Sequence, residues 1–550
     1  ATKQGGTTAT LVYRTVIQDN FSNQHNQSGF TKDSSVDLAD TLTNNVTISG
    51  KVVGSNQLEE DTSKASISIP EPKSTKEIYA INGVVVSDPS KVKIAPGQTI
   101  TYRLKTELPI ADTEKLKLTD FLPLPVFNAA ELTGSSIGAF SGVPGAGTMT
   151  FGPSHTLNSI VPGVTPTFTI NGTQNTIAIN FGSFDDPQNR SATIDLLFTV
   201  TATDKPFTDG LFLTNQAQTD YGSTDDAFKA AVTEIVQVEL IQPSLKITKG
   251  VVSTTATTPT FDKPIGPVTF NTAGTTGAAF SGTIDSAGLK TKPVDANLTG
   301  VDAGDLVRFA LVIENTGGSG GFDAAIKDLL PTGLINPQNL RITDGAGNVI
   351  NYTGDLFGAT GLTLTDDTDG AINAGRNGST PTADGKNIIV ITYDATVATA
   401  VNPKQTLTSG AEILQFAGKE GGVDYTANAT NPNWVNDAST TGATPKLTLN
   451  LVGSEINNTT NNNTQAVIGE LVEYEMVLTV PEGTTPEAAL VNTLPAGLSL
   501  AEFTSVTLSP GLTSSTVTNL GSLLTNTTAS GNNFTLNLGT LTNTNTDNAT

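Results

Sequence analysis

Residues Gly134 to Gly138 read Gly-Ser-Ser-Ile-Gly, which matches the pattern around the nucleophilic serine of many hydrolases. In those enzymes the serine sits on a strand-turn-helix and needs a histidine that accepts its proton. The chain has only two histidines, His25 and His155, and the motif lies in a glycine-rich stretch without a helical pattern. We therefore expect no catalytic residues and no enzyme.

A second group, from Asp366 to Asn373, has the alternating acidic residues of a calcium-binding loop. Asp367, Asp369 and Asn373 are candidate ligands, and the glycine between them suits a sharp turn. The segment lacks the acidic first ligand and the bidentate glutamate that complete such a loop. A solvated acidic turn is the alternative interpretation. A structural Ca²⁺ is the only cofactor that the sequence suggests.

Asparagines in Asn-x-Ser/Thr triplets are candidate sites for covalent glycans. A chain this rich in Asn and Thr contains such triplets by chance, so each one permits a glycan without requiring it. The Asn-rich and Thr-rich run at 457–464 should form an exposed loop, which makes it the best candidate. The triplets begin at Asn20, Asn26, Asn45, Asn171, Asn189, Asn297, Asn351, Asn377, Asn428, Asn457, Asn458, Asn462, Asn526, Asn533 and Asn548.

The composition is that of an exported, multidomain protein. A length of 550 residues suits about three domains. Only 15% of the residues are charged, and the chain has no cysteine, so no disulfide holds any domain. The net charge of −23 argues against nucleic acids or anionic lipids as partners, and no stretch has the roughly 20 apolar residues that span a bilayer.

The sequence contains an internal repeat. A glycine turn followed by strict apolar/polar alternation occurs at Ala95–Leu104, Ala303–Val312 and Ile468–Val477. Alternation of this kind predicts half-buried strands. Each copy is followed by a second strand that ends in a Leu-Pro turn, at Pro123, Pro331 and Pro495. Helical patterns are almost absent, with one short candidate at 225–231, so the sequence predicts an all-β protein.

Prolines mark the junctions between the repeats, at Pro70 and Pro72, Pro243 and Pro445. Because proline fixes φ and restricts the preceding residue, we expect short, semi-rigid junctions and an elongated rod. The predicted parts are donor strands at 1–72, module 1 at 73–242, module 2 at 243–444 and an incomplete module 3 at 445–550. An insertion in module 2, at 253–297, should form a protruding hairpin or an arm that packs on a neighbour.

The repeats resemble a tandem domain of unknown function found in prokaryotic surface proteins. Its signature is the alternating strand after a glycine turn, an Asn-Thr-Gly step and a Leu-Pro-x-Gly-Leu turn. The copy at 303–334 carries all three, whereas the first copy lacks the glycine of the last turn and the third lacks the Asn-Thr-Gly step. The resemblance implies tandem immunoglobulin-like β-sandwiches at the cell surface and implies no activity.

The two ends of the chain read as the two halves of one domain. Phe534, Leu536 and Leu538 continue module 3 as Ile177, Ile179 and Phe181 continue module 1, but the later strands of module 1 have no counterpart before Thr550. Their counterparts stand at the other end of the chain, so the terminal domain is split between the two ends. The predicted donor residues are Leu11, Tyr13 and Ile17, followed by Leu42, Val46 and Ile48.

This split predicts a structural subunit of an extracellular filament or surface fibre, with another copy of itself as the head-to-tail partner. Burial of each donor side chain contributes roughly 1.5–3 kcal/mol. Ordering costs roughly 1–2 kcal/mol per residue, so two donor segments are needed for a stable joint. The alternative is a tandem-repeat adhesin or stalk of which this chain is a fragment. A third class, a carbohydrate-binding module, would need an exposed aromatic row, and the aromatic content of 6% gives it little support.

Overall fold

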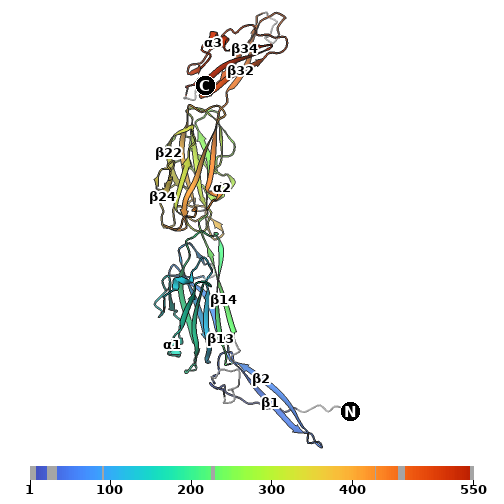
Figure 1. Cartoon of the computed structure of the whole chain (residues 1–550), viewed down its shortest axis with the longest axis vertical. Coiled ribbons are helices and arrows are strands. Elements are labelled where there is room, and N and C mark those ends of the chain that lie inside the picture. The colour runs from blue at the N-terminus through green and yellow to red at the C-terminus, as the bar shows by residue number, and fades with distance from the viewer. Residues whose placement is uncertain are drawn as a thin grey trace. The chain divides into compact units, whose positions relative to one another are not determined.

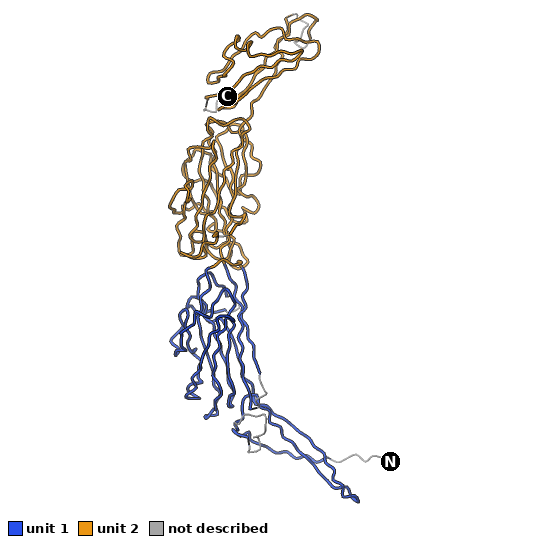
Figure 2. Tube along the Cα trace, viewed as in Figure 1, with its two compact units in different colours: residues 1–204, 210–241 blue, residues 205–209, 242–550 orange. Residues whose placement is uncertain are grey.

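The structure is a computed structural model that describes residues 8–21, 34–88, 92–224, 230–427, 429–455 and 465–545. The described chain is nearly all β and forms tandem β-sandwiches, as predicted (Figure 1). It divides into two compact units (Figure 2). The first comprises residues 1–204 and 210–241, and the second comprises residues 205–209 and 242–550.

The first unit contains one complete sandwich of two six-stranded sheets. One sheet has the order β4-β3-β6-β12-β9-β8, and the other has the order β10-β11-β7-β13-β14-β5. Side chains alternate into the space between them, as in β13, where every second residue from Leu213 is buried. The strands are β3 (Lys73–Ile81), β4 (Val84–Val85), β5 (Lys93–Ile94), β6 (Thr99–Leu108), β7 (Thr113–Phe121), β8 (Ile137–Gly138), β9 (Thr148–Phe151), β10 (Thr167–Asn171), β11 (Thr176–Phe184), β12 (Ala192–Thr201), β13 (Leu211–Gly222) and β14 (Ala230–Leu240). Two short helices, η2 (Ala129–Leu132) and α1 (Leu157–Ile160), lie in the connections.

A two-stranded hairpin precedes this sandwich and belongs to the same unit. It consists of β1 (Thr41–Lys51) and β2 (Leu58–Ser68), which pair with each other and with no other described strand (Figure 1). All residues of both strands are exposed except Leu42, which is half-buried. The segment 34–40 before the hairpin packs on the sandwich instead, with Val36 and Leu38 buried.

The second unit begins with another complete sandwich. Its four-stranded sheet has the order β15-β20-β27-β22, and its seven-stranded sheet has the order β16-β19-β29-β28-β21-β24-β23. The strands are β15 (Leu245–Thr254), β16 (Thr260–Phe261), β19 (Leu298–Val301), β20 (Leu306–Asn315), β21 (Phe322–Leu329), β22 (Leu334–Asp344), β23 (Tyr352–Gly354), β24 (Leu362–Leu364), β27 (Ile388–Val397), β28 (Thr406–Ala417) and β29 (Val435–Gly442). Small pairs are formed by β17 (Thr269–Phe270) with β18 (Phe280–Ser281), and by β25 (Arg376–Asn377) with β26 (Thr380–Pro381).

The insertion at 253–297 covers its own module. Phe270, Phe280 and Ile284, together with Leu289 of helix α2 (Ser286–Thr291), pack on the outward side chains of β20 and β27 and form a second core. The expectation of a protruding hairpin or an arm for a neighbour is therefore wrong. The reason is that β20 and β27 are apolar on both faces, and the insertion buries the outer one.

The second unit ends with two small sheets. One is the pair of β30 (Lys446–Ser454) and β31 (Val472–Thr479). The other has β35 (Asn533–Asn543) paired with β32 (Gly483–Thr493), β33 (Leu512–Ser514) and β34 (Thr527–Ser530), and helix α3 (Leu520–Thr525) lies before β34. A small core forms between them around Val480, Val517 and Phe534. Among the described helices, none has the length and apolar character needed to cross a bilayer.

Candidate strand-complementation interface

Two strands of the last sheets have an edge without a partner among the described residues. In the complete sandwiches, β6 lies between β3 and β12, and β20 lies between β15 and β27. Among the strands that the structure describes, their counterpart β31 pairs only with β30. Likewise β7 lies between β11 and β13, whereas its counterpart β32 pairs only with β35 among the described strands. Each sheet of the last module thus presents an open edge where the complete modules continue.

The open module also exposes apolar side chains that its counterparts bury. Tyr474 of β31 is 44% exposed, whereas Phe309 at the same position of β20 is fully buried. Leu449 of β30 is exposed as well, at 55%. Exposed apolar area of this kind is costly in water and is typical of a surface that another chain covers.

The β1–β2 hairpin has the same register as the β13–β14 hairpin of the complete first sandwich. In the complete first sandwich, Leu213 of β13 pairs with Val238 of β14. In the N-terminal hairpin, Leu42 of β1 pairs with Ile67 of β2, and the two pairs are separated by the same number of residues along the chain. Both strands of the hairpin therefore match β13 and β14 with one common alignment.

That alignment also sorts the exposed side chains of the hairpin by face. The buried positions of β13 correspond to Leu42, Asn44, Val46 and Ile48, so these side chains lie on one face of β1. Val46 and Ile48 are 61% and 72% exposed. An isolated two-stranded hairpin is marginally stable in water, so this apolar face needs a partner.

The chain before each hairpin is anchored in the same way. Asp209, which precedes β13, accepts hydrogen bonds from the backbone N–H groups of Gln242 and Gly318 within the second unit. Asp40, which precedes β1, accepts bonds from the backbone N–H and the hydroxyl of Thr224 within the first unit. In both cases an aspartate before the hairpin accepts hydrogen bonds from the unit whose sandwich follows that hairpin in the sequence.

The predicted donor residues lie on this exposed N-terminal part. Leu11, Tyr13 and Ile17 are exposed and lie outside the strands. Leu42, Val46 and Ile48 lie on β1, but β1 has a partner in its own chain. The partner strand β2, which the sequence did not reveal, makes β1 one half of a hairpin.

The predicted acceptor residues lie on β35. Phe534, Leu536 and Leu538 are all buried, and Phe534 packs edge-on against Phe503 with ring centroids 5.4 Å apart. They form part of the small core of the last module, between its two sheets. These three side chains therefore belong to the core of the last module and do not lie on its open edges.

None of the predicted calcium ligands belongs to the cluster of carboxylates that the described residues form. Asp367 accepts a hydrogen bond from the backbone N–H of Asp369, and both are exposed, as expected for a solvated turn. The carbonyl of Asn373 accepts a bond from Asn315. The carboxylates that do gather are Asp323, Asp366 and Glu420, and repulsion by the first two raises the pKa of Glu420. Asp366 accepts hydrogen bonds from the backbone N–H groups of Asp323 and Ala371, and Asp323 accepts one from the backbone N–H of Gly421.

The candidate glycan sites fall into two groups. Exposed ones are Asn20, Asn45, Asn171, Asn189, Asn351, Asn377 and Asn533. Asn297 and Asn526 are half-buried, and their amide nitrogens donate hydrogen bonds to Asp262 and to the carbonyls of Thr516 and Ser522. The remainder, Asn26, Asn428, Asn457, Asn458, Asn462 and Asn548, lie outside the described residues, as does His25.

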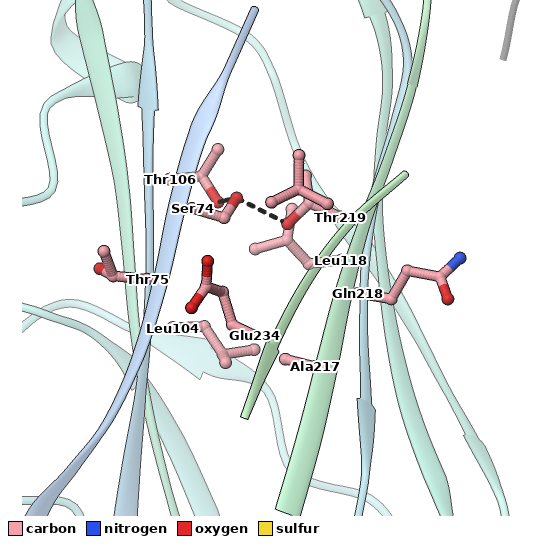
Figure 3. A pocket seen from close by; sticks show the side chains of 10 residues that line it. Ser74, Thr75, Leu104, Thr106, Leu118, Ala217, Gln218, Thr219 and Glu234 are labelled. Atoms are coloured by element: carbon pink, nitrogen blue, oxygen red, sulfur yellow. Dashed lines mark hydrogen bonds between the residues drawn. The ribbon is translucent and has the colours of Figure 1, made fainter. Parts of the chain in front are cut away.

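The first sandwich has a small cavity among its described residues. A cavity of about 10 Å³, the volume of one water molecule, lies between β3 and the β13–β14 hairpin (Figure 3). The Ser74 hydroxyl bridges it by bonding with Thr106 at 3.0 Å and Thr219 at 2.8 Å. His155 stacks on Phe151 at 3.8 Å, and burial lowers its pKa. Ser135 donates to the carbonyl of Leu132, so the serine motif forms an ordinary turn.

Comparison with known proteins gives no family. No family profile matches the chain, and no curated protein matches it. Solved structures that share features include the C-terminal domain of the AgI/II polypeptide BspA of Streptococcus agalactiae, at 13% identity, covering 67% of this chain and 100% of that one, with a TM-score of 0.28. BcpA, the major pilin subunit of Bacillus cereus, matches at 11% identity over 71% of this chain and 81% of its own, with a TM-score of 0.22. Scores this low support no conclusion about function.

Sequence reasoning missed two buried ion pairs, Lys76 with Asp120 and Lys249 with Asp328. A signal was present, because Asp120 and Asp328 both stand three residues before the proline of the repeated turn. A charge that recurs on a strand expected to face the core needs a buried partner.

Proposed function

We propose that this protein is a structural subunit of an extracellular filament or surface fibre, and that its subunits join head-to-tail by strand complementation. The β1–β2 hairpin of one copy completes the last module of the next copy. The observation that carries this proposal is the common alignment of β1 and β2 with β13 and β14. The low charge, the absence of cysteine and the exposed sequons support an extracellular location, with covalent glycans on the fibre surface.

The complete first sandwich supplies the expected geometry of the joint. There β13 pairs antiparallel with β7, with Gln218 opposite Thr119. Carried over by the alignment, β1 pairs with the open edge of β32, and Thr47 of one copy faces Val491 of the next. The segment 8–17 takes the place of β12 beside β31, with Tyr13 opposite Met476, because Leu196 pairs with Leu104 in the intact module.

Both partners gain from this arrangement. The hairpin buries Val46 and Ile48, and the recipient buries Tyr474. Each fully buried apolar side chain contributes about 1.5–3 kcal/mol, and each new ladder hydrogen bond contributes about 0.5–1.5 kcal/mol. Since β1 and β2 already pair with each other, part of the ordering cost is met before the subunits meet.

The contact is heterologous, because the donor and acceptor surfaces differ. It cannot close as a symmetric dimer, and repetition gives a filament or a ring. Addition of an extended segment to a sheet edge is a known mode of association in which main-chain bonds give affinity and alternate side chains give specificity.

A disulfide test measures the register directly, because the chain has no cysteine of its own. The variant Thr47→Cys with Val491→Cys places both thiols on the outer face of the joint. We expect covalent ladders of chains on a non-reducing gel after mild oxidation. A disulfide requires Cα atoms within about 7 Å, so the pair reports strand register and not mere proximity.

The matched control is Thr47→Cys with Ala489→Cys, which is two residues out of register and should give no ladder. If the full chain remains monomeric by native mass spectrometry and the Thr47–Val491 pair forms no intermolecular disulfide, the proposal is wrong. The hairpin would then belong to a tandem array within one longer chain, which is the adhesin or stalk alternative.

A further inference from the structure

Each complete sandwich contains a buried lysine in contact with a buried aspartate. Lys76 of β3 contacts Asp120 of β7, and Lys249 of β15 contacts Asp328 of β21. All four side chains have no solvent exposure. The strands of each pair belong to opposite sheets of their sandwich, so each contact crosses a core.

The two pairs occupy equivalent positions. Lys76 pairs with Leu104, and Lys249 pairs with Leu311. Both leucines are the seventh residue after the turn glycine of the repeat, and both aspartates stand three residues before its proline. A third polar side chain in the core also recurs at an equivalent position. Asn215 stands two residues after Leu213 in β13, and Ser409 stands two residues after Leu407 in β28.

The amine and the carboxyl group are held at reacting distance. Lys249 Nζ lies 2.6 Å from both carboxylate oxygens of Asp328, which brings it within about 3 Å of the carboxyl carbon, the range of a near-attack geometry. The rings of Phe309 and Tyr393 lie 5.0 and 5.6 Å from the amine and exclude water. In the first sandwich, Tyr102 and Phe198 lie 4.9 and 6.0 Å from Lys76 Nζ.

Hydroxyl groups are placed where charge would develop during attack on the carboxyl carbon. Ser409 donates to Asp328 Oδ1 at 3.0 Å, and Tyr393 donates to Asp328 Oδ2 at 3.0 Å. Such donors stabilise the oxyanion of a tetrahedral intermediate. In the first sandwich the Asn215 side chain lies beside Asp120, and its interaction with the carboxylate opposes the rise in the pKa of Asp120 that burial causes.

We propose that these pairs condense to intramolecular amide cross-links, Lys76 to Asp120 and Lys249 to Asp328. The lone pair of the neutral amine attacks the carbon of the protonated carboxyl group, and a new C–N bond forms. The C–OH bond breaks, the hydroxyl leaves with one proton from the nitrogen as water, and the amide remains. The step needs no oxidant, reductant or cofactor.

Burial favours the reactive protonation states and the product. It lowers the pKa of both lysines, that of Lys249 to about 8, and it raises the pKa of Asp120. The unreacted pair buries two charges with a large loss of hydration, whereas the amide buries none. Water released from a closed apolar core does not readily return, so the reverse reaction is suppressed.

The test is the intact mass of the full chain, produced in a host that adds no glycans and denatured before measurement. We expect a mass below the sequence mass by two water molecules. The variants Lys76→Met and Lys249→Met should each lose only one water molecule. A protease digest of the wild type should contain branched peptides that join β3 to β7 and β15 to β21.

A wild-type mass equal to the sequence mass, with linear peptides containing Lys76 and Lys249, would overturn the proposal. Loss of ammonia in place of water from the first sandwich would overturn its Asp120 assignment, because Asn215 would then be the acceptor. The peptide map of the wild type needs no variant to fold. The matched control is Lys246→Met, which removes an exposed lysine of β15 and should leave both losses of water unchanged.

Discussion

Asp209 Oδ2 accepts two hydrogen bonds from the guanidinium of Arg376, at 2.8 Å from Nη2 and 3.1 Å from Nε. The other oxygen of Asp209 accepts the backbone N–H groups of Gln242 and Gly318, at 2.8 and 3.1 Å. One carboxylate therefore ties the segment 205–209 to the second unit, although β12 and β13 on either side of it belong to the first.

Replacement of Asp209 by alanine should release this segment. Hydrogen bonds to charged groups contribute about 1.5–3 kcal/mol, and loss of about 1.4 kcal/mol changes a local opening constant tenfold. We expect hydrogen exchange of the Gln242 and Gly318 amides to accelerate at least about tenfold. Asp209→Asn keeps one acceptor oxygen for these amides and should show a smaller change; equal exchange rates in wild type and Asp209→Ala would contradict the assignment.

The face of β1 that carries Val46 and Ile48 should decide polymerisation. Val46→Asp with Ile48→Asp places two charges on the face that corresponds to the buried face of β13, where an unpaired charge is strongly unfavourable. We expect loss of filaments in electron micrographs while the two complete sandwiches keep their cooperative unfolding. Thr47→Asp places the same charge on the opposite face and should polymerise; filaments from the double variant would show that this face is not buried.

The anchorage of residues 34–40 should weaken as pH rises. Burial raises the pKa of Asp37 from 3.8 to about 7, with further repulsion from Asp40 and Glu114 and opposing hydrogen bonds from Thr224 and Ser35. The folded state thus keeps a proton that the unfolded chain loses, so this contribution to stability is complete below about pH 4 and declines up to about pH 7. Between about pH 4 and pH 7, the protection of the Leu38 amide against hydrogen exchange should fall in the wild type and stay constant in Asp37→Asn. The same pH profile of protection in both proteins would contradict the raised pKa of Asp37.

Glycan attachment should follow the environment of each sequon. The Asn351 and Asn377 side chains are exposed, whereas the Asn297 amide nitrogen donates to Asp262 at 2.9 Å and its oxygen accepts from Ser439. Attachment at Asn297 would break these bonds. In a glycosylating host, glycopeptide mass spectrometry should find sugar on Asn351 or Asn377 and none on Asn297. Occupied Asn297 would mean that the glycan is added before this loop folds.

The sequence predicted the all-β fold because a period of two is visible wherever one face of a strand is buried, as in β6, β20 and β31. It did not reveal β2, whose residues Glu59 to Asp61 and Lys64 hide the alternation under charge. Strand pairing across a hairpin is set by register, and register becomes visible only when both strands are placed side by side.

The candidate interface was also predicted from apolar/polar alternation, and that prediction also lacked the pairing of the strands. The donor residues of β1 could be found from their alternation, and the pairing that sorts them by face could not. The buried lysines escaped because charged residues ordinarily mark solvent-facing positions, and only a partner from the opposite sheet makes Lys76 or Lys249 acceptable in a core.

The last module carries Leu449 where the complete modules carry a lysine, and Asn492 where they carry an aspartate. Asn44 of the hairpin corresponds to Asn215, so a joint assembled from two molecules would have only neutral groups at its centre. No ion would have to shed its hydration shell when subunits meet, and no covalent tie could lock them. Growth and repair of such a fibre could then proceed by exchange of whole subunits at its ends, while each subunit keeps its own interior intact.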